Sequence, residues 1–204
     1  MLKNHYISNI LEAGIDEAGR GPLFGRIYAA AVILPKGDMF DHSLMKDSKK
    51  LSSKKREIAA LYIKENAIDY GIAYSDEGAI DRDNIFNSTQ QTMHKALHNL
   101  DVVPDHLLVD GPHFATYLKN NRLIPFTCIE GGDNLYTPIA AASILAKVER
   151  DKYIEKMCDV YPELDEKYGL RKNKGYGTKQ HMEGIKKYGT TKWHRKTFGL
   201  CKFY

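Results

Sequence analysis

Gly14-Ile15-Asp16-Glu17-Ala18-Gly19-Arg20-Gly21-Pro22 is the stretch that decides the fold, because two adjacent carboxylates are followed at once by a glycine-arginine-glycine turn. An apolar run, Ile27 to Leu34, follows shortly after it. Neighbouring side chains of a strand point to opposite faces, so Asp16 and Glu17 can serve one site only where the strand ends. Glycine lets the main chain approach a ligand, and arginine offers several donors. The alternative is a tight turn with solvated acids.

Apolar patterning along the rest of the chain predicts alternating strands and helices. The first two strands, separated by a short turn, are expected to form a hairpin. Small side chains near the start of the last long helix permit a close approach to the sheet. The expected strands are Leu11–Asp16, Arg26–Leu34, Ile68–Tyr74, His106–Asp110 and Leu123–Ile129, and the expected helices are Lys54–Asn66, Ile85–Asn99, Pro138–Met157 and Lys179–Tyr188.

Four acids lie at or near predicted strand ends, namely Asp16, Glu17, Asp110 and Asp133. If they converge, they cannot all stay ionised without cations. Oxygen-only ligands favour Mg²⁺ or Mn²⁺, and two such ions could activate a water for attack on a phosphodiester. Asp151 lies more than three helical turns beyond Asp133, about 20 Å away along the last long helix. We therefore interpret Asp151 as structural.

Several local signals within the elements leave alternatives open. Ser52 or Ser53 is expected to cap the helix that follows, with Ile58, Leu61 and Tyr62 on one face. Asn84 is equally compatible with a helix cap and with a substrate contact. Thr137 and Pro138 suit the cap and first turn of the long helix. The second long helix is expected to bury one stripe, Ile85, Thr89, Met93, Ala96 and Leu100.

The composition, 43% hydrophobic and 27% charged over 204 residues, is that of an ordinary globular protein. No stretch of about 18 apolar residues occurs, and the first residues resemble no signal peptide, so we expect neither a membrane span nor export. The three cysteines have no paired spacing, which argues against a disulfide framework or a zinc site. We therefore expect a cytoplasmic protein.

Basic charge is concentrated near the C-terminus. Residues 167–204 hold eleven Lys or Arg and one acid, whereas residues 1–166 carry a net charge of −6. A basic segment beside an acidic body suits a metal-dependent nuclease, although a lysine run is more often a solvated helix face. Lys49 and Lys50 could likewise bind phosphate or merely solvate a helix start. Tyr176, bracketed by glycines, could stack on a sugar or simply fill its loop.

Five motifs in order resemble the ribonuclease HII family of type 2 ribonucleases H. The resemblance runs from Gly14 to Phe198, and its motifs lie in residues 16–22, 47–52, 140–151, 174–178 and 194–198. It implies a ribonuclease H-like mixed five-stranded sheet flanked by helices, with a small C-terminal helical region. We expect residues 1–160 to form the catalytic domain and residues 161–204 the basic substrate-binding region.

The resemblance also implies an activity and its residues. Members cut the RNA strand of RNA/DNA hybrids and cut 5′ of single ribonucleotides in duplex DNA, leaving 3′-hydroxyl and 5′-phosphate ends, as in ribonucleotide excision repair. They use two Mg²⁺ or Mn²⁺ ions. The implied catalytic and metal-binding residues are Asp16, Glu17, Asp110 and Asp133, and the implied substrate-binding residues are Gly19, Arg20, Gly21, Lys49, Lys50, Asn84 and Tyr176.

The sequence departs from the family pattern at one position. Gly131 stands where the family usually has lysine, which alters the charge beside Asp133.

Three other classes of protein are alternatives to ribonuclease HII. Ribonuclease HIII is disfavoured, because Asp16 stands near the start of the chain and the glycine-arginine-glycine turn is intact. Another nuclease or a transposase of the same fold would share the acids but would lack Gly19 to Gly21 and Tyr176. A non-catalytic nucleic-acid-binding protein would not need Asp16 and Glu17. We expect a monomer, with residues 198–204 packed or frayed rather than docked on a replication clamp.

Overall fold

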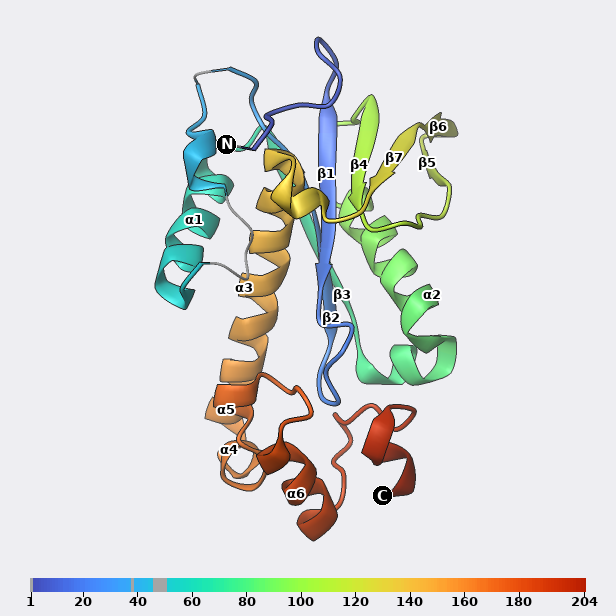
Figure 1. Ribbon diagram of the computed structural model, residues 1–204. Coiled ribbons are helices and arrows are strands. Elements are labelled where there is room, and N and C mark those ends of the chain that lie inside the picture. Colours follow the sequence, from blue (N-terminus) through green and yellow to red (C-terminus); the bar gives the residue numbers. More distant parts are fainter. Residues whose placement is uncertain (1, 38, 46–50) are drawn as a thin grey trace.

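The computed structural model describes residues 2–37, 39–45 and 51–204. Its centre is a mixed five-stranded sheet, which confirms the predicted fold class (Figure 1). The strand order is β3 (Asp69–Ser75), β2 (Ile27–Ile33), β1 (Glu12–Ala18), β4 (His106–Asp110) and β7 (Phe126–Ile129). β1, β2 and β3 pair antiparallel, whereas β4 pairs parallel with β1 and β7 pairs parallel with β4. The predicted hairpin of the first two strands is thereby confirmed.

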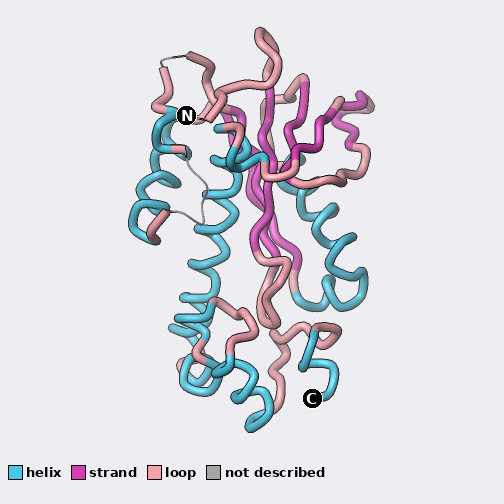
Figure 2. Tube along the Cα trace, in the orientation of Figure 1, coloured by secondary structure: helices cyan, strands magenta, loops and turns pink. Residues whose placement is uncertain are grey.

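Helices cover both faces of this sheet (Figures 1 and 2). α3 (Thr137–Val160) packs on β1 and β2, and α1 (Ser53–Asn66) lies against α3. α2 (Glu77–His98) covers the other face. The remaining elements are the short 3-10 helices η1 (His42–Leu44), η2 (Gly132–Asn134) and η3 (Gly199–Phe203), the small hairpin β5 (Tyr117–Lys119) and β6 (Arg122–Ile124), and the C-terminal helices α4 (Glu163–Tyr168), α5 (Leu170–Asn173) and α6 (Lys179–Tyr188).

The first turn of α3 passes unusually close to β1 at Gly14. A Cβ atom added to Gly14 would lie 2.1 Å from the carbonyl carbon of Pro138 and 2.4 Å from the amide nitrogen of Ile139. The alanines at 140–142 continue this tight packing along the helix, and all three are fully buried. The absence of a side chain at Gly14 therefore sets the distance between α3 and the sheet.

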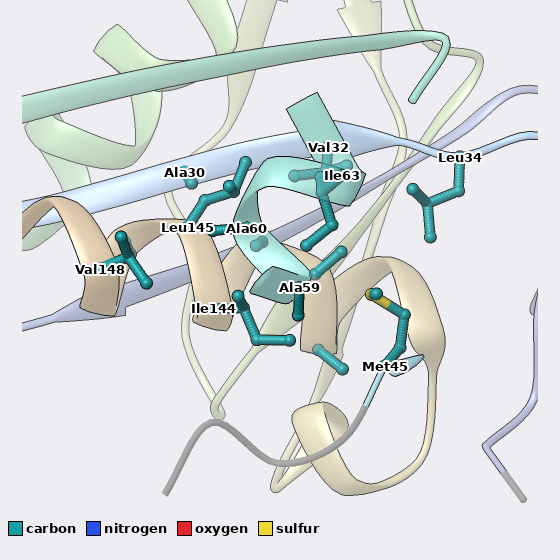
Figure 3. Packing of buried hydrophobic residues seen from close by; sticks show 14 of the residues in the cluster. Ala30, Val32, Leu34, Met45, Ala59, Ala60, Ile63, Ile144, Leu145 and Val148 are labelled. Atoms are coloured by element: carbon teal, nitrogen blue, oxygen red, sulfur yellow. The ribbon is translucent and has the colours of Figure 1, made fainter. Parts of the chain in front are cut away.

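The α3 side of the sheet contains a core built mainly from small and aliphatic side chains. Figure 3 shows α1 placing Ala59, Ala60 and Ile63 against Ile144 and Leu145 of α3. On the α2 side, a separate cluster joins the odd-numbered positions of β1 to the inner stripe of α2. Most of the predicted stripe is buried, as Thr89, Met93, Ala96 and Leu100 show.

The face of α1 on which Ile58 and Leu61 lie is turned mainly to solvent. Ile58 and Leu61 are more than half exposed, whereas the neighbouring Ala59, Ala60 and Ile63 are buried. The close contact with α3 favours small side chains, so the largest apolar residues do not mark the buried face. Ser52 caps this helix as expected, because its hydroxyl accepts a hydrogen bond from Lys55 N–H.

Three element boundaries also differ from the prediction. The expected strand Leu123–Ile129 is divided at Pro125, which has no N–H to continue a strand ladder, so β6 and β7 belong to different sheets. α2 begins at Glu77 rather than Ile85, with Asp76 as its cap and a kink at Asn84. Thr137 is the first residue of α3 and not its cap, which is Tyr136.

The C-terminal helices share a third hydrophobic cluster with the end of α3. It joins Phe24, Tyr153 and Ile154 to Leu164 and Tyr168. α3 ends at the predicted break, with Tyr161 as its C-cap. The division of the chain into domains at residue 160 stays a prediction. Among the residues that the structure describes, no helix is both long and apolar enough to cross a membrane.

Gly14→Ala is expected to destabilise the protein by about 1–3 kcal/mol or more, because the new methyl group would overlap the main chain of α3. Gly78→Ala is the matched control. Its methyl group would meet only Asp76 Oδ1, at 3.5 Å, so replacing glycine within α2 should stabilise by about 0.5–1 kcal/mol. Denaturant unfolding measures both changes. Equal stabilities for Gly14→Ala and the wild type would contradict the close-packing argument.

Candidate active site

The pairing of β1 with β4 places two acids side by side. Ile15 pairs with Val109 in the parallel register, and the next residues along the two strands are Asp16 and Asp110. Asp16 follows Gly14 on the face toward α3, because side chains alternate along a strand. Asp16 is only 5% exposed. The structure therefore brings Asp16 and Asp110 together beneath α3.

A cavity of about 220 Å³ opens beside these acids. It includes Glu17, so the two neighbouring carboxylates of the motif do serve one site. The strand ends one residue later, at Ala18, which satisfies the geometric condition set by the sequence. The residues that line the cavity are Asp16, Glu17, Ala18, Gly19, Arg20, Gly21, Asp110, Ser143, Lys147, Arg150 and Tyr176.

The electrostatic environment favours the protonated forms of Asp16 and Glu17. Burial raises the pKa of Asp16 well above its usual range, and the charges of Glu17 and Asp110 raise it further. Burial and Asp110 also raise the pKa of Glu17, against the opposing effect of Arg20. Folded Asp16 therefore keeps its proton to a higher pH than unfolded Asp16. Its contribution makes the free energy of unfolding fall as the pH rises from about 4 through the raised pKa.

Each carboxylate is held by donors of the protein itself. Asp16 accepts hydrogen bonds from Glu17 N–H at 2.7 Å and from the Ser143 side chain. Glu17 pairs with Arg20 at 3.5 Å, and Asp110 accepts from Gly132 N–H at 2.7 Å. Within residues 2–37, 39–45 and 51–204, no three His, Cys, Asp or Glu side chains are arranged to hold a metal ion. These acids offer the oxygen-only ligands that suit Mg²⁺ or Mn²⁺, but the present rotamers serve internal hydrogen bonds.

The residue before Asp133 is bonded to one of these acids, which places Asp133 near the group. It is buried in η2, and its carboxylate accepts from Asn134 Nδ2 at 2.9 Å. The preceding residue, Gly132, donates to Asp110, so η2 and β4 are locked together. Gly131 adopts φ 66°, the left-handed conformation that glycine tolerates best. Asp133 is absent from the cavity lining given above for the described part of the chain.

Two buried arginines hold the turn that follows the acids. Arg195 donates to the carbonyls of Gly19, Arg20 and Gly25 at 2.7–3.0 Å. Arg150 donates to the carbonyls of Phe24, Arg26 and Lys174 at 2.9–3.2 Å. Both side chains are almost fully buried. The main chain of residues 19–26 is therefore fixed by charge-assisted hydrogen bonds from α3 on one side and the C-terminal segment on the other.

The close approach of these arginines requires glycine in the turn. A Cβ atom on Gly19 would lie 2.3 Å from Arg150 Nε, and Gly19 has φ 104°. Burial and the neighbouring charge of Arg150 lower the pKa of Arg195 to about 9, so its guanidinium remains charged at neutral pH. Arg150 lines the cavity and Arg195 is bonded to the turn that lines it, so two positive charges lie near a site where they suit a polyanionic ligand.

Tyr176 also lines the cavity. A Cβ atom on Gly21 would lie 3.6 Å from its ring, and the Arg150 guanidinium lies 5.8 Å from the ring centre. The side chain is 44% exposed, so one part of the ring is open to a ligand. The structure therefore brings Tyr176 from the C-terminal region to the glycine-arginine-glycine turn.

The remaining residues considered from the sequence are not among those that line this cavity in the described structure. Lys49 and Lys50 lie outside the described residues. Asn84 is the kink of α2, with φ 63° and ψ 165°, and its side chain accepts from Asn87 N–H, which confirms the cap interpretation. It lines a separate hollow of about 550 Å³. Asp151 pairs with Arg56 at 3.3 Å and with Lys147 at 2.6 Å, in agreement with a structural role.

Sequence reasoning missed three residues of α3 that line the cavity and one arginine of the C-terminal segment that holds its turn. Ser143, Lys147 and Arg150 occupy successive turns of α3, and Arg195 belongs to the His-Arg motif. A polar residue at each turn of an otherwise alanine-rich helix was the available signal for the first three. The carbonyl partners of Arg195 are about 170 residues away in sequence, so nothing local indicated them.

Comparison with known proteins gives consistent matches. A family model described as ribonuclease HII matches residues 13–201. Ribonuclease HII of Christiangramia forsetii is 48% identical over 199 residues, which cover 98% of this chain and 96% of that protein. The crystal structure of ribonuclease H2 from Pyrococcus horikoshii OT3 is similar with a TM-score of 0.75 at 25% identity, covering 95% of this chain and 96% of that one. The structure of Bst-RNase HIII in complex with Mn²⁺ has a TM-score of 0.70 at 20% identity, covers 95% and 68%, and shows a likeness of fold alone.

Glu17→Gln is expected to lower the pKa of Asp16, because it removes one of the two negative charges that oppose ionisation of Asp16. The decrease should be partial, since burial is the larger cause. Carboxyl ¹³C NMR titration in metal-free buffer measures it. Glu65→Gln, an exposed acid of α1, is the control and should leave Asp16 unchanged. An unaltered Asp16 titration in Glu17→Gln would contradict the coupling.

Proposed function

The chain belongs to the ribonuclease HII family, and we propose that it cuts RNA/DNA hybrids and also cuts duplex DNA on the 5′ side of a single ribonucleotide. Members of this family are hydrolytic nucleases, endoribonucleases that act on RNA/DNA hybrids. The proposed products are a 3′-hydroxyl and a 5′-phosphate, as ribonucleotide excision requires. One observation carries the proposal: a single cavity joins three acids to the glycine-arginine-glycine turn and Tyr176.

The family is metal-dependent, and we propose Asp16, Glu17, Asp110 and Asp133 as the catalytic residues that hold two Mg²⁺ or Mn²⁺ ions. The donor set supports this assignment, because it offers only oxygen ligands, and because burial together with the charges of Glu17 and Asp110 raises the pKa of Asp16. When bound, such ions supply an activated water and stabilise the leaving oxygen of a phosphodiester. Ser143 and the Glu17 N–H orient Asp16, while Glu17 lines the cavity beside Arg20, its partner at 3.5 Å.

Recognition of the ribose 2′-hydroxyl is proposed for the main chain of Gly19, Arg20 and Gly21. The carbonyls of Gly19 and Arg20 point to Arg195. Their peptide bonds are trans, so the N–H groups of Arg20 and Gly21 point the opposite way, away from Arg195. This orientation supports their use as donors to a ligand in the cavity. The 2′-hydroxyl is the group that distinguishes RNA from DNA at one nucleotide.

Tyr176 is proposed to pack against the sugar beside the cut. Its ring is half exposed and faces Gly21, which places an aromatic surface next to the proposed 2′-hydroxyl donors. The basic region of residues 161–204 supplies this residue and Arg195, so we propose it as the substrate-binding region of the protein. Its net positive charge suits a phosphate backbone.

Further substrate contacts and the cellular setting are also proposals. Lys49 and Lys50 are assigned to phosphate binding from their motif. We also propose that Asn84 contacts the substrate. Its strained backbone lines a surface hollow together with Arg82 and Gln90. We propose a cytoplasmic monomer whose partners are RNA/DNA hybrid and ribonucleotide-containing duplex DNA. A non-catalytic binding protein is disfavoured by the family, whose members are hydrolases.

Asp16→Asn is expected to lower cleavage about a thousandfold or more while preserving the fold and hybrid binding, because it removes a metal-binding charge. Asp151→Asn is the matched control on the paired acid of α3 and should keep activity. The assay uses labelled duplex DNA with one ribonucleotide, alongside all-DNA and hybrid duplexes, in Mg²⁺, in Mn²⁺ and in chelator. Activity in chelator, or a folded and active Asp16→Asn, would contradict the proposed chemistry.

Tyr176→Ala is expected to reduce the preference for a ribonucleotide junction roughly tenfold, which corresponds to the loss of one stacking contact. Tyr188→Ala, which removes a similarly exposed tyrosine of α6, serves as the control and should keep that preference. The measurement is the ratio of kcat/KM on the single-ribonucleotide duplex to kcat/KM on a long hybrid. An unchanged ratio in Tyr176→Ala would refute the role proposed for Tyr176.

A further inference from the structure

Two buried histidines form a direct contact behind Tyr176. His181 lies in α6 and His194 in the segment after it, and the exposed fractions of their side chains are 0% and 1%. Their Nε2 atoms are 3.1 Å apart. At this distance one nitrogen must carry a hydrogen and the other must accept it, because two unprotonated or two protonated nitrogens would repel.

The neighbours of the pair determine which histidine donates. Thr191 N–H lies 2.9 Å from His194 Nδ1, and an amide can only donate, so this nitrogen is the acceptor. Neutral His194 therefore carries its hydrogen on Nε2 and donates to His181. His181 must then carry its own hydrogen on Nδ1, where the carbonyl of Tyr176 lies 3.0 Å away and can only accept. The four groups form one directed chain from Thr191 to Tyr176.

The surroundings of the pair favour neutral rings. Burial lowers the pKa of His181, and burial together with the nearby His181 lowers the pKa of His194 to about 3. Phe24 and Tyr168 pack edge-on against His194, and the Tyr168 hydroxyl donates to the carbonyl of Gly189. The adjacent Arg195 guanidinium is directed at the carbonyls of residues 19–25. Within the described chain, the interactions that shift these two pKa values include no carboxylate.

The pair connects the two halves of the proposed ribose-binding site. His194 is followed directly by Arg195, which holds the carbonyls of Gly19 and Arg20. His181 holds the carbonyl of Tyr176, which also accepts from Thr178 N–H at 2.8 Å. The preceding carbonyl, that of Gly175, accepts from Leu23 N–H at 2.8 Å, which joins the main chain before Tyr176 to the turn. The histidine contact adds a second connection, at the carbonyl of Tyr176 itself.

We propose that His181 and His194 are positioning residues for ribonucleotide recognition, which hold Tyr176 in register with the glycine-arginine-glycine turn through the directed chain from Thr191. They act through Tyr176 and the segment bearing Arg195, and neither ring lines the cavity of the described structure. The inference rests on the proposed role of Tyr176 in junction selectivity. Loss of the pair should therefore reduce selectivity for a ribonucleotide junction without removing the acids.

Histidine ¹⁵N NMR of the wild-type protein tests the chain directly. At pH 7 we expect both rings to be neutral, His181 with its hydrogen on Nδ1 and His194 with its hydrogen on Nε2. This measurement requires no variant, so it does not depend on how well a substituted protein folds. A doubly protonated ring at pH 7, or the reverse tautomer of either histidine, would overturn the proposal.

Substitution then tests the function of the pair. His181→Phe fills the site without a donor and is expected to reduce junction selectivity roughly tenfold, as a small misplacement of a binding group does. His181→Asn offers an amide N–H near the position of Nδ1 and should retain most of the selectivity. His106→Phe is the control. It replaces another buried histidine, bonded to Thr127, and is expected to lower the melting temperature without changing selectivity.

The double variant His181→Phe/Tyr176→Ala separates positioning from general damage. If His181 acts through Tyr176, His181→Phe should not lower selectivity further once the tyrosine ring is gone. Equal losses in both backgrounds, or normal selectivity in folded His181→Phe when Tyr176→Ala has lost it, would overturn the inference. Normal selectivity in Tyr176→Ala would instead refute the proposed function of Tyr176, so the two failures are distinguishable.

Discussion

The close contact between α3 and β1 is the constraint on which the rest of the structure depends. Gly14 allows the first turn of α3 to meet the strand main chain, and the alanines at 140–142 keep the helix near the sheet. Asp16 follows two residues after Gly14 on the same face, so it lies under the helix and beside Ser143. The same contact that packs the core therefore desolvates the proposed catalytic acid and raises its pKa.

α3 then carries this geometry to the other end of the cavity. Arg150 extends from the helix to the carbonyls of residues 24, 26 and 174, and Arg195 binds the same turn from the C-terminal segment. A hydrogen bond to a charged donor contributes about 1.5–3 kcal/mol, so the five that reach residues 19–26 give the turn a strong preference for one conformation. The cost of burying two cations is offset only while all these carbonyls stay in place. The turn, α3 and the C-terminal region therefore form one unit.

The acids and the recognition surface depend on different forces. Repulsion among buried carboxylates leaves the acid cluster short of positive charge, which a divalent cation can supply. Tyr176 is held by the histidine pair through its backbone carbonyl. The acids are thus in a position to bind a cation, whereas Tyr176 is fixed by uncharged hydrogen bonds. This separation would allow the rotamers of the acids to change without moving the surface proposed to bind the ribose.

Periodicity, caps and acids at strand ends are local signals, so the sequence predicted the five strands of the sheet, the helix ends at Ser52 and Tyr161, and three acids that line one cavity, Asp16, Glu17 and Asp110. The fifth strand was extended through Pro125, where the missing N–H divides the ladder. The apolar residues of α1 did not mark its buried side, because the contact with α3 selects small side chains there. The residues that support the site, namely Ser143, Arg150, Arg195 and the pair His181–His194, could be identified only from the tertiary structure. Their partners are carbonyls and side chains distant in sequence, and a hydrogen bond across such a distance exists only once the chain has folded.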